Sequence, residues 1–391
     1  MTAPRPSMSA RRERSRRLLW EEINRRGSTT RSELSAATGL SVSAVSAGVA
    51  DLLRAGVVIE EDPGLPITGR GRPSSVLSPA RPLGYVAGID FGHQHVRVAL
   101  SSTDGTLAGE EIHHLDVDAH AGQALDTAKD AVRHLLERAG AARSSLLGAA
   151  AGIPGPLDRA RRVVNSPTIL ASWIDLAPAE ELCSRLQVPV HVENDADMGA
   201  LGEKRFGAAT GLTDFLYIKA SDGIGAGVVI DGRCHRGGGG FVGEIGHIHL
   251  EGMTNRCRCG NQGCLESAIS AAEVRRQLSS TRLGQASDAT AGELFTRAAG
   301  DPVGARILTD AGRMIGRVVA DGCVWLNPQA VILGGELGLS GAPFAEGVRE
   351  SLTRYSLSAS AAHVKVLPAG LGAHAEVMGA VSVAIERCTT P

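Results

Sequence analysis

Hydrophobic residues recur at helical spacing near the N-terminus. A mostly charged stretch over residues 11–26 has apolar positions at Leu18, Leu19 and Ile23, which share one helix face. We therefore predict a first helix that ends at Gly27, because glycine is typical of helix C-termini.

Two further short helices are predicted on either side of a Gly-Leu turn at residues 39–40. Thr30 lies three residues before Glu33, which is the spacing of a capping box, and begins the second helix. Ser41 is a candidate N-cap for the third helix. The apolar stripe of that helix comprises Val45, Val49, Leu52 and Leu53.

Two short β-like runs, residues 57–59 and 75–77, follow the third helix and enclose a loop rich in glycine, proline and arginine. Such a pair of runs is typical of a β-hairpin. Three short helices, a tight turn and a hairpin in this order predict a winged helix-turn-helix, whose third helix enters the major groove of DNA.

Beyond a proline-punctuated linker at residues 78–82, β-like runs alternate with helical patterns. The predicted strands cover residues 85–90, 96–100, 147–152, 188–192, 215–218, 225–230 and 330–333. The predicted helices cover residues 121–139, 178–186, 305–325 and 344–352. This alternation indicates an α/β body, and two sheets around a cleft fit its length.

The composition is that of a globular protein with two or three domains. The chain has 391 residues, of which 43% are hydrophobic, enough to bury more than one core. Every run of about 18 residues contains glycine, proline or charge, and the N-terminus lacks an apolar signal-peptide core. We therefore expect a cytoplasmic protein with no membrane contact.

Charge is distributed unevenly along the chain. Residues 1–80 contain twelve arginines and eight acidic residues, a net charge of +4, and the remainder carries −6. A basic head on an acidic body favours phosphate binding by the head alone. Arginines of the first helix could contact DNA phosphates, namely Arg11, Arg12, Arg14, Arg16 and Arg17.

The predicted base contacts lie in the wing more than in the third helix. The exposed positions of that helix include Ser43 and Ser46 but no arginine, lysine, asparagine or glutamine, so strong bidentate base readout is not expected. Arg70 and Arg72 belong to a Gly-Arg-Gly-Arg-Pro segment of the wing loop, which could enter a minor groove. The alternative is a helical extension that serves only in dimerisation.

Three of the seven cysteines are close in sequence, in the segment Cys257-Arg-Cys259-Gly-Asn-Gln-Gly-Cys264. Three thiolates and one histidine make a closed tetrahedral zinc site, which would be structural because no coordination position is open. His247 and His249 compete as the fourth ligand, and spacing alone does not decide between them. Free structural thiols, or a disulfide, are the alternatives to zinc.

Three motifs together carry a resemblance to a known family. They are Cys-x-Cys-Gly-x-x-Gly-Cys-Leu-Glu at residues 257–266, Gly-Glu-x-Gly-His at 243–247 and Asp-Gly-Ile-Gly-Ala-Gly at 222–227. The chain resembles the ROK family (repressors, open reading frames, kinases) over essentially its whole length. The fused winged helix makes it similar to the repressor branch.

The resemblance implies a fold class and a division into domains. Residues 1–80 would form the winged helix-turn-helix with its linker, and the body would be a two-lobed actin-like ATPase (ribonuclease H-like) fold. Lobe one would cover residues 81–195 and be completed by a C-terminal helix at 374–391. Lobe two would cover residues 196–373 and carry the zinc motif.

The resemblance also implies a sugar site in the cleft between the lobes. The residues expected to contact sugar hydroxyls are Asn194, Asp195, Glu244, His247 and Glu266. His247 would hold zinc through one ring nitrogen and the sugar through the other, so the metal would orient a sugar-binding side chain. Taken alone, Asn194 and Asp195 favour an Asx turn or a helix N-cap.

In the family's kinases, the aspartate that matches Asp195 is the general base, and here we expect a vestigial or weak one. His93 replaces a glycine of the kinase phosphate loop, and Asp222 places a carboxylate where triphosphate would lie. ATP and magnesium are therefore doubtful cofactors. The candidate nucleotide-binding residues that survive are Gly223, Gly225, Gly334 and Gly335.

These observations predict a sugar-responsive transcriptional repressor with a structural zinc. Its partners would be a double-stranded DNA operator, a sugar effector and a second copy of itself, in a homodimer or homotetramer. An ATP-dependent sugar kinase with a DNA-binding extension is the main alternative. A regulator controlled by a protein partner is the third.

Overall fold

The computed structural model describes residues 8–61, 75–80, 84–158, 163–164, 169–285 and 291–389. The chain forms two compact units, which are treated separately below. The smaller unit comprises Met1–Tyr85, Ser102–Thr106 and Ile385–Pro391, and the larger comprises Val86–Ser101 and Leu107–Ala384.

The described part of the smaller unit consists mainly of three helices and a three-stranded sheet. Its elements are α1 (Met8–Arg26), β1 (Thr29–Thr30), α2 (Arg31–Thr38), α3 (Val42–Arg54), β2 (Val58–Glu61) and β3 (Val76–Pro79). The antiparallel strands have the order β1-β3-β2. One core joins the helices to the sheet and includes Leu19, Ile23, Leu34, Val45, Val49, Leu52, Val58 and Leu77. The predicted winged helix-turn-helix is confirmed.

Polar side chains fix the helix ends of this unit where the sequence predicted them. The Thr30 hydroxyl accepts from the Glu33 N–H at 3.3 Å, and the Glu33 carboxylate accepts from the Thr30 N–H at 2.8 Å, which completes a capping box. The Ser41 hydroxyl caps α3 by accepting from the Ala44 N–H at 3.3 Å, without a reciprocal bond. Gly39 has φ 67°, a left-handed conformation that glycine adopts without strain. The turn is therefore determined by local chemistry.

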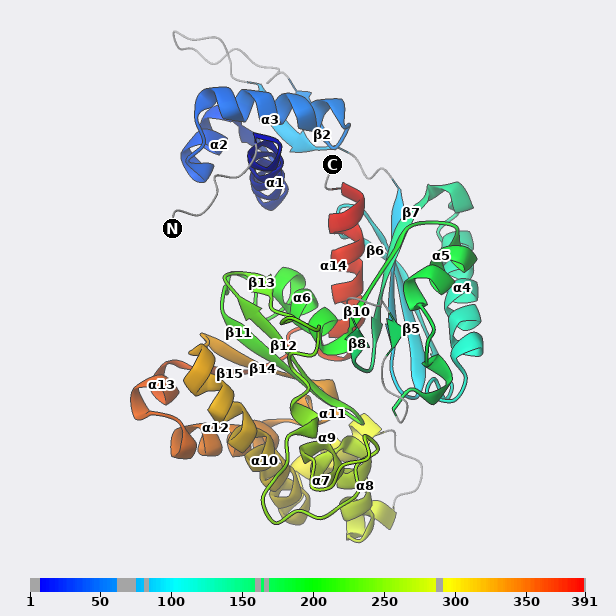
Figure 1. Ribbon diagram of the computed structural model, residues 1–391, viewed down its shortest axis with the longest axis vertical. Coiled ribbons are helices and arrows are strands. Elements are labelled where there is room, and N and C mark those ends of the chain that lie inside the picture. Colours follow the sequence, from blue (N-terminus) through cyan, green and yellow to red (C-terminus); the bar gives the residue numbers. More distant parts are fainter. Residues whose placement is uncertain are drawn as a thin grey trace. The chain divides into compact units, whose positions relative to one another are not determined.

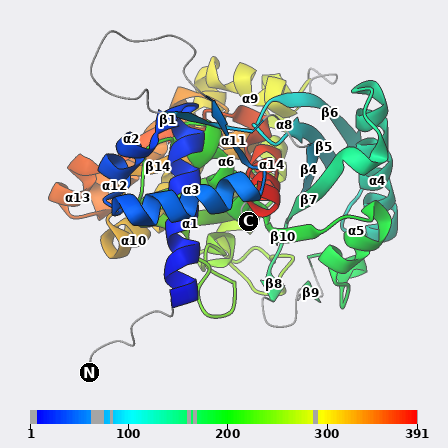
Figure 2. The ribbon, with the colours of Figure 1, turned by 90° about the horizontal axis from the view of Figure 1, so that it is seen from above.

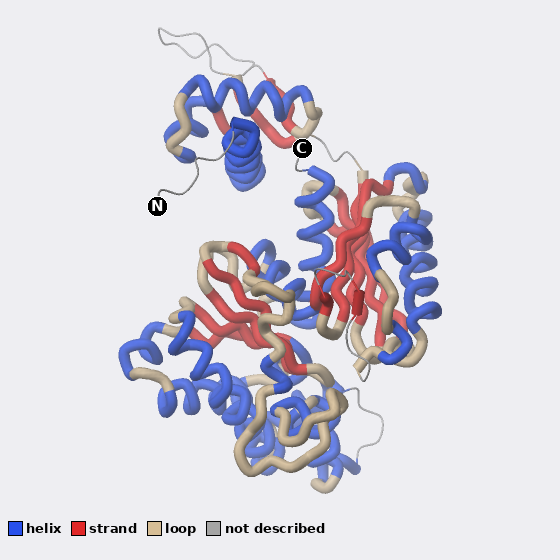
Figure 3. The backbone as a smooth tube through the Cα atoms, in the orientation of Figure 1, coloured by secondary structure: helices blue, strands red, loops and turns tan. Residues whose placement is uncertain are grey.

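The larger unit contains two five-stranded sheets, and Figure 3 shows their strands as two separate groups. The first sheet has the order β10-β7-β4-β5-β6, formed by β4 (Tyr85–Phe91), β5 (His95–Ser102), β6 (Leu107–His114), β7 (Leu146–Ile153) and β10 (Val190–Asn194). The second has the order β13-β12-β11-β14-β15, formed by β11 (Phe215–Ala220), β12 (Ile224–Ile230), β13 (Arg233–Cys234), β14 (Ala330–Gly334) and β15 (Lys365–Pro368). A small pair, β8 (Leu157–Asp158) and β9 (Val163–Val164), stands apart from both sheets.

Helices α4 (Ala121–Arg138) and α5 (Pro178–Leu186) lie together beside the first sheet in Figure 1 and in Figure 2. α6 (Asp195–Phe206) begins directly after β10 and packs against β11 and β12, so it links the two sheets. The remaining helices are α7 (Leu265–Ile269), α8 (Ala271–Ser279), α9 (Ala291–Ala299), α10 (Pro302–Leu326), α11 (Gly335–Gly338), α12 (Ala342–Tyr355), α13 (Ser358–His363) and α14 (Ala375–Thr389).

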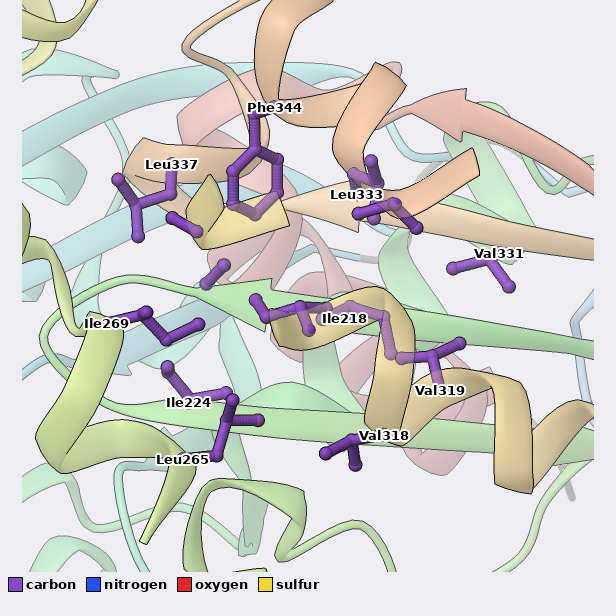
Figure 4. Packing of buried hydrophobic residues seen from close by; sticks show 14 of the residues in the cluster. Ile218, Ile224, Leu265, Ile269, Val318, Val319, Val331, Leu333, Leu337 and Phe344 are labelled. Carbon is purple, nitrogen blue, oxygen red and sulfur yellow. The ribbon is translucent and has the colours of Figure 1, made fainter. Parts of the chain in front are cut away.

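The core around the second sheet is built mainly by α10 and α12. Figure 4 shows Val319 of α10 and Phe344 of α12 in the same cluster as Ile218 and Val331 of the sheet. A Cβ atom at Gly312 of α10 would lie 2.1 Å from the carbonyl oxygen of Phe344, so glycine permits the close approach of the two helices.

The seven predicted strands of the body are all present, with bounds that differ by a few residues. The sequence analysis missed β6, β13 and β15, which are edge strands of the two sheets, and the short pair β8 and β9. β6 has exposed and half-buried positions along its whole length, so it lacks the apolar run of a central strand. Within the described ranges, no single helix combines the length and apolar character needed to cross a membrane; α2 and α3 meet that test only as a pair bent by 116°.

Helix α14 approaches α6 so closely that the contact requires glycine. A Cβ at Gly379 would lie 1.7 Å from the carbonyl oxygen of Met198, whereas a Cβ at Gly122 of α4 meets nothing within 4 Å. Overpacking costs about 1–3 kcal/mol or more. We expect Gly379→Ala to lower the free energy of unfolding by about 2 kcal/mol or more. The control Gly122→Ala should leave it unchanged or raise it slightly, and equal stability of the two variants in urea denaturation would contradict the close contact.

Candidate functional site

A small cavity lies where β10 and α6 face the β11–β12 hairpin. It has a volume of about 40 Å³, and it is lined by the five residues proposed for hydroxyl contacts, Asn194, Asp195, Glu244, His247 and Glu266. Gly223 and Gly225 line it as well. These five residues are up to 72 positions apart in sequence, and they line one cavity, as the motifs predicted.

A larger cavity of about 440 Å³ adjoins the small one. The two cavities share His93, Asp195, Lys219 and Gly223, so they form one continuous cleft. Gly335 lines the larger cavity. Gly334 serves packing, since a Cβ there would lie 2.1 Å from the hydroxyl of Tyr217. Together the cavities reach the size of a small-molecule site, about 300–1,000 Å³.

Asn194 caps helix α6. Its Oδ1 accepts hydrogen bonds from the N–H groups of Ala196 at 2.8 Å and Asp197 at 3.3 Å, and its Nδ2 donates to the Gly155 carbonyl at 3.3 Å. The N-cap interpretation is confirmed. The same bonds fix the amide at the edge of the small cavity.

Asp195 is a buried carboxylate with a buried cation beside it. Lys219 Nζ donates to Asp195 Oδ2 at 2.6 Å, and Oδ1 accepts from the Ala196 N–H at 2.7 Å. Burial by itself would lower the pKa of Lys219, but the carboxylates of Asp195, Glu376 and Asp90 outweigh it and raise that pKa above its ordinary value. Lys219 is therefore an ammonium at the point where the two cavities meet.

Glu266 and Glu244 present carboxyl groups of different character to the small cavity. Glu266 Oε1 accepts from Arg258 Nε at 3.0 Å, and its Oε2 accepts from the Ile224 N–H at 3.0 Å, so each oxygen is already held by one donor. Burial, followed by the charges of Asp195 and Glu266, raises the pKa of Glu244 to about 7. A glutamate protonated part of the time can donate to a hydroxyl as well as accept from it.

One histidine and three cysteines form a compact ligand cluster. The ligand atoms of His247, Cys257, Cys259 and Cys264 all lie within 4.8 Å of one another. The Cys257 Sγ to His247 Nδ1 distance and the Cys259 Sγ to Cys264 Sγ distance are both 3.7 Å. Tetrahedral zinc with ordinary bond lengths would place two sulfurs about 3.8 Å apart and a sulfur and a nitrogen about 3.6 Å apart. The donor set and its spacing fit zinc.

The structure distinguishes the two candidate histidines. His249 is outside the cluster, and its Nδ1 lies 3.0 Å from the carbonyl oxygen of Gln262. His247 directs Nδ1 toward Cys257, while its Nε2 lies 3.9 Å from a carboxylate oxygen of Glu244 and its side chain lines the small cavity. The two nitrogens of His247 thus face two different environments.

His93 stands between the two cavities. Its Nδ1 lies 2.8 Å from Asp118 Oδ1, and a Cβ added to Gly223 would come within 2.9 Å of its Nε2. The imidazole therefore fills the space directly beside the glycine-rich loop. This placement agrees with the expectation that His93 occupies space a phosphate would need.

Three cations were missed by the sequence analysis: Lys219, which lines the cleft, and Arg258 and Arg275, which bind residues that line it. Arg275 donates to the Asp222 carboxylate at 2.9 Å, so the negative charge that the sequence placed against a triphosphate is partly balanced. The sequence contains a feature that points to each of the other two cations. Lys219 interrupts an otherwise apolar strand, and Arg258 separates two of the clustered cysteines.

The candidate DNA contacts of the smaller unit are only partly described. Ser43 and Ser46 are exposed on α3, whereas Arg70 and Arg72 lie outside the described residues. Arg12, one of the arginines expected to meet phosphate, makes a bidentate contact of 2.8 Å with Asp51 of α3. That side chain therefore ties α1 to the recognition helix.

Comparison with known proteins places these features in context. The family model described as "ROK family" matches residues 86–387. The xylose repressor of Bacillus spizizenii is 29% identical over 372 residues, which cover 95% of this chain and 94% of that protein. The similarity to this repressor therefore includes the N-terminal unit.

Solved structures show the same fold. A ROK family transcriptional regulator, a homologue of the E. coli Mlc protein, has a TM-score of 0.79 at 23% identity, and the match covers 97% of each chain. A ROK family glucokinase from Streptomyces griseus, in complex with glucose and AMPPNP, has a TM-score of 0.68 at 28% identity. That match covers 77% of this chain and 99% of the glucokinase.

Asp197, a buried residue in the first turn of α6, gives the stability of the protein a testable pH dependence. Its carboxylate accepts from the Cys234 thiol at 3.0 Å and lies 3.7 Å from Arg236, and burial raises its pKa to about 6. Between about pH 4 and pH 6 the Asp197 carboxyl therefore binds more protons in the folded protein than in the unfolded chain, so this group makes stability fall as pH rises through that window.

Asp197→Asn removes this titration. We expect the stability of the variant relative to the wild type to increase from pH 4.5 to pH 7.5, by up to about 2 kcal/mol. Denaturant unfolding at both pH values measures the effect. Asp310→Asn, at an exposed position of α10, controls for the loss of a surface carboxylate. A pH-independent difference between Asp197→Asn and wild type would contradict the shift.

Proposed function

This chain belongs to the ROK family, and we propose that it is a sugar-responsive transcriptional repressor, with operator DNA bound by the winged helix and a sugar effector bound in the cleft. The observation that carries the proposal is the presence of a winged helix-turn-helix in a chain that matches a xylose repressor over 95% of its length. The match to the glucokinase structure covers only 77% of the chain.

A sugar is the ligand class best suited to the small cavity. The side chains of Asp195, Glu244, His247 and Glu266 offer fixed acceptors and donors around one small space. Hydroxyl groups can satisfy both kinds of partner. A ligand without the matching hydroxyls would leave buried polar groups unpaired, which is the basis of strong discrimination by such sites.

Zinc is proposed as a structural component of the sugar site. His247, Cys257, Cys259 and Cys264 would hold it, and it would supply fixed loop geometry because it is a closed four-ligand site. The Nδ1 of His247 would be engaged there, so its Nε2 would keep one orientation toward the sugar pocket.

Two observations argue against efficient phosphoryl transfer to the sugar. The Lys219 ammonium is hydrogen-bonded to Asp195, so a sugar hydroxyl would compete with a cation for the expected base. His93 fills the space beside Gly223, where a phosphate would approach the backbone. Phosphoryl transfer depends on such positioning. We therefore assign the cleft to sensing, and Asp195 to sugar binding with at most weak activity as a base.

The proposed regulator acts as a homo-oligomer. Two winged helices spaced by the oligomer would match the two halves of an inverted repeat. Sugar binding would change that spacing and lower the affinity for the operator, which is allosteric coupling between two sites. Ser43, Ser46, Arg70 and Arg72 are the proposed DNA contacts, with the wing arginines in the minor groove.

A gel-shift titration tests the regulatory function. The DNA is a fragment upstream of the protein's own gene, and the probe sugars are glucose, N-acetylglucosamine, mannose and xylose. We expect at least one sugar to weaken DNA binding about tenfold, within the usual range of allosteric coupling. Glu266→Gln should bind the DNA as the wild type does but require more sugar. DNA binding unaffected by every sugar would refute an effector role for this set.

Metal analysis tests the ligand assignment. We expect about one zinc per purified chain, and we expect Cys259→Ser and His247→Ala to lose most of it because a closed site tolerates no missing ligand. His249→Ala is the matched control, since His249 lies two residues from His247 but outside the cluster, and it should retain its zinc. Full metal content in Cys259→Ser would disprove the assignment.

A further inference from the structure

Arg258 occupies the single position between two of the clustered cysteines, and its guanidinium contacts three separate parts of the larger unit. Its Nε donates to Glu266 of α7 at 3.0 Å, and one terminal nitrogen donates to the carbonyl oxygen of Asp222 at 2.6 Å. The other terminal nitrogen lies 3.4 Å and 3.5 Å from the two ring nitrogens of His93 and 3.7 Å from Asp118 Oδ2. One side chain thus connects the cysteine loop to both walls of the cleft.

These contacts cross between the two sheets. His93 follows β4, and Asp118 precedes α4, so both belong to the part of the unit built on the first sheet. Asp222 and Glu266 belong to the part built on the second sheet. His93 and Glu266 also line the small cavity. Arg258 therefore contacts one cavity residue from each of the two parts.

The planar guanidinium is required for this arrangement. Its donors point in fixed directions, so the two hydrogen bonds to Glu266 and Asp222 direct the remaining terminal nitrogen toward His93 and Asp118. A lysine would keep the positive charge but would not reproduce the fork. The backbone of Arg258 is held on both sides by Cys257 and Cys259, so the ligand cluster limits where the guanidinium can be.

We propose that Arg258 is the positioning residue that couples the zinc loop to sugar affinity, by orienting Glu266 and by joining the two walls of the cleft. This rests on the proposed sugar site and deepens it. A sugar that contacts Glu266 and His93 would also restrain the cysteine loop, because Arg258 lies in that loop and contacts both residues. Sugar binding and zinc retention are then linked, and by reciprocity each stabilises the other.

The test compares Arg258→Ala and Arg258→Lys with Arg256→Ala in the full-length, zinc-loaded protein. Arg256 directly precedes Cys257, which Arg258 directly follows. The Arg256 side chain is exposed and makes a long 3.4 Å contact with the Gly260 carbonyl of its own loop, so Arg256→Ala controls for the loss of one arginine from the loop. Calorimetric titrations use glucose, xylose and N-acetylglucosamine. Zinc content, thermal midpoint and the rate of zinc removal by excess EDTA are measured for each variant.

We expect Arg258→Ala to keep its zinc, to unfold at a lower temperature because the buried Glu266 carboxylate loses its cation, and to bind sugar about tenfold more weakly than wild type, within the range of coupling between two sites. Arg258→Lys should remain weakened because it lacks the fork, and Arg256→Ala should bind as wild type does. EDTA should remove zinc several-fold faster from Arg258→Ala, and sugar should slow that removal only in the wild type and Arg256→Ala.

Unchanged sugar affinity in Arg258→Ala, full recovery in Arg258→Lys, or loss of affinity together with loss of zinc would overturn the proposal. Failure of the wild type to bind any of the three sugars would count against the proposed function instead. In that case zinc removal decides: faster removal from Arg258→Ala than from Arg256→Ala supports the link, and equal rates exclude it.

Discussion

Three thiols and one imidazole lie within 4.8 Å of one another between β13 and α7, and the placement of the cavity residues depends on that approach. The segment contains one short 3-10 helix, η3 (Ile245–His247), and its other backbone hydrogen bonds lie in turns and isolated bridges, such as the one between His249 and Cys264. Burial, followed by the neighbouring sulfurs of Cys259 and Cys257, raises the pKa of the Cys264 thiol to about 12. A bound zinc would favour the thiolates and convert metal affinity into folding free energy of the loop. The zinc bound to this loop would then orient His247, Arg258 and Glu266 together.

Three carboxylates of the cleft are paired with cations. Asp195 is bonded to Lys219, Glu266 to Arg258 and Asp222 to Arg275. Asp195 and Glu266 are buried, so removing the cation of either one would leave a buried charge uncompensated, which is far more costly than the pair itself is stabilising. A cleft lined by these carboxylates suits a neutral polyol better than a polyphosphate. The kinase-like arrangement of Asp195 and the glycine-rich loop is thus retained, while the groups around it favour recognition over transfer.

Local sequence patterns determined the winged helix-turn-helix and the candidate cavity residues. Thr30 and Glu33 cap α2 within three residues of each other, and such short-range bonds depend little on the rest of the fold. The central strands of the body were predicted because both of their faces are buried and their residues are apolar. The edge strands β6 and β15 were not predicted, because each is partly exposed and carries a mixed polar pattern.

The sequence by itself determined which residue types the site contains, whereas the tertiary structure decided how they pair. His247 is the ligand and His249 is not because the loop turns one ring toward the thiols, and two-residue spacing does not encode that choice. Lys219 meets Asp195 across 24 residues, and Arg258 meets His93 across 165. Contacts at such separations exist only when the two sheets have folded and α6 has joined them, since their geometry comes from packing and no local pattern specifies it.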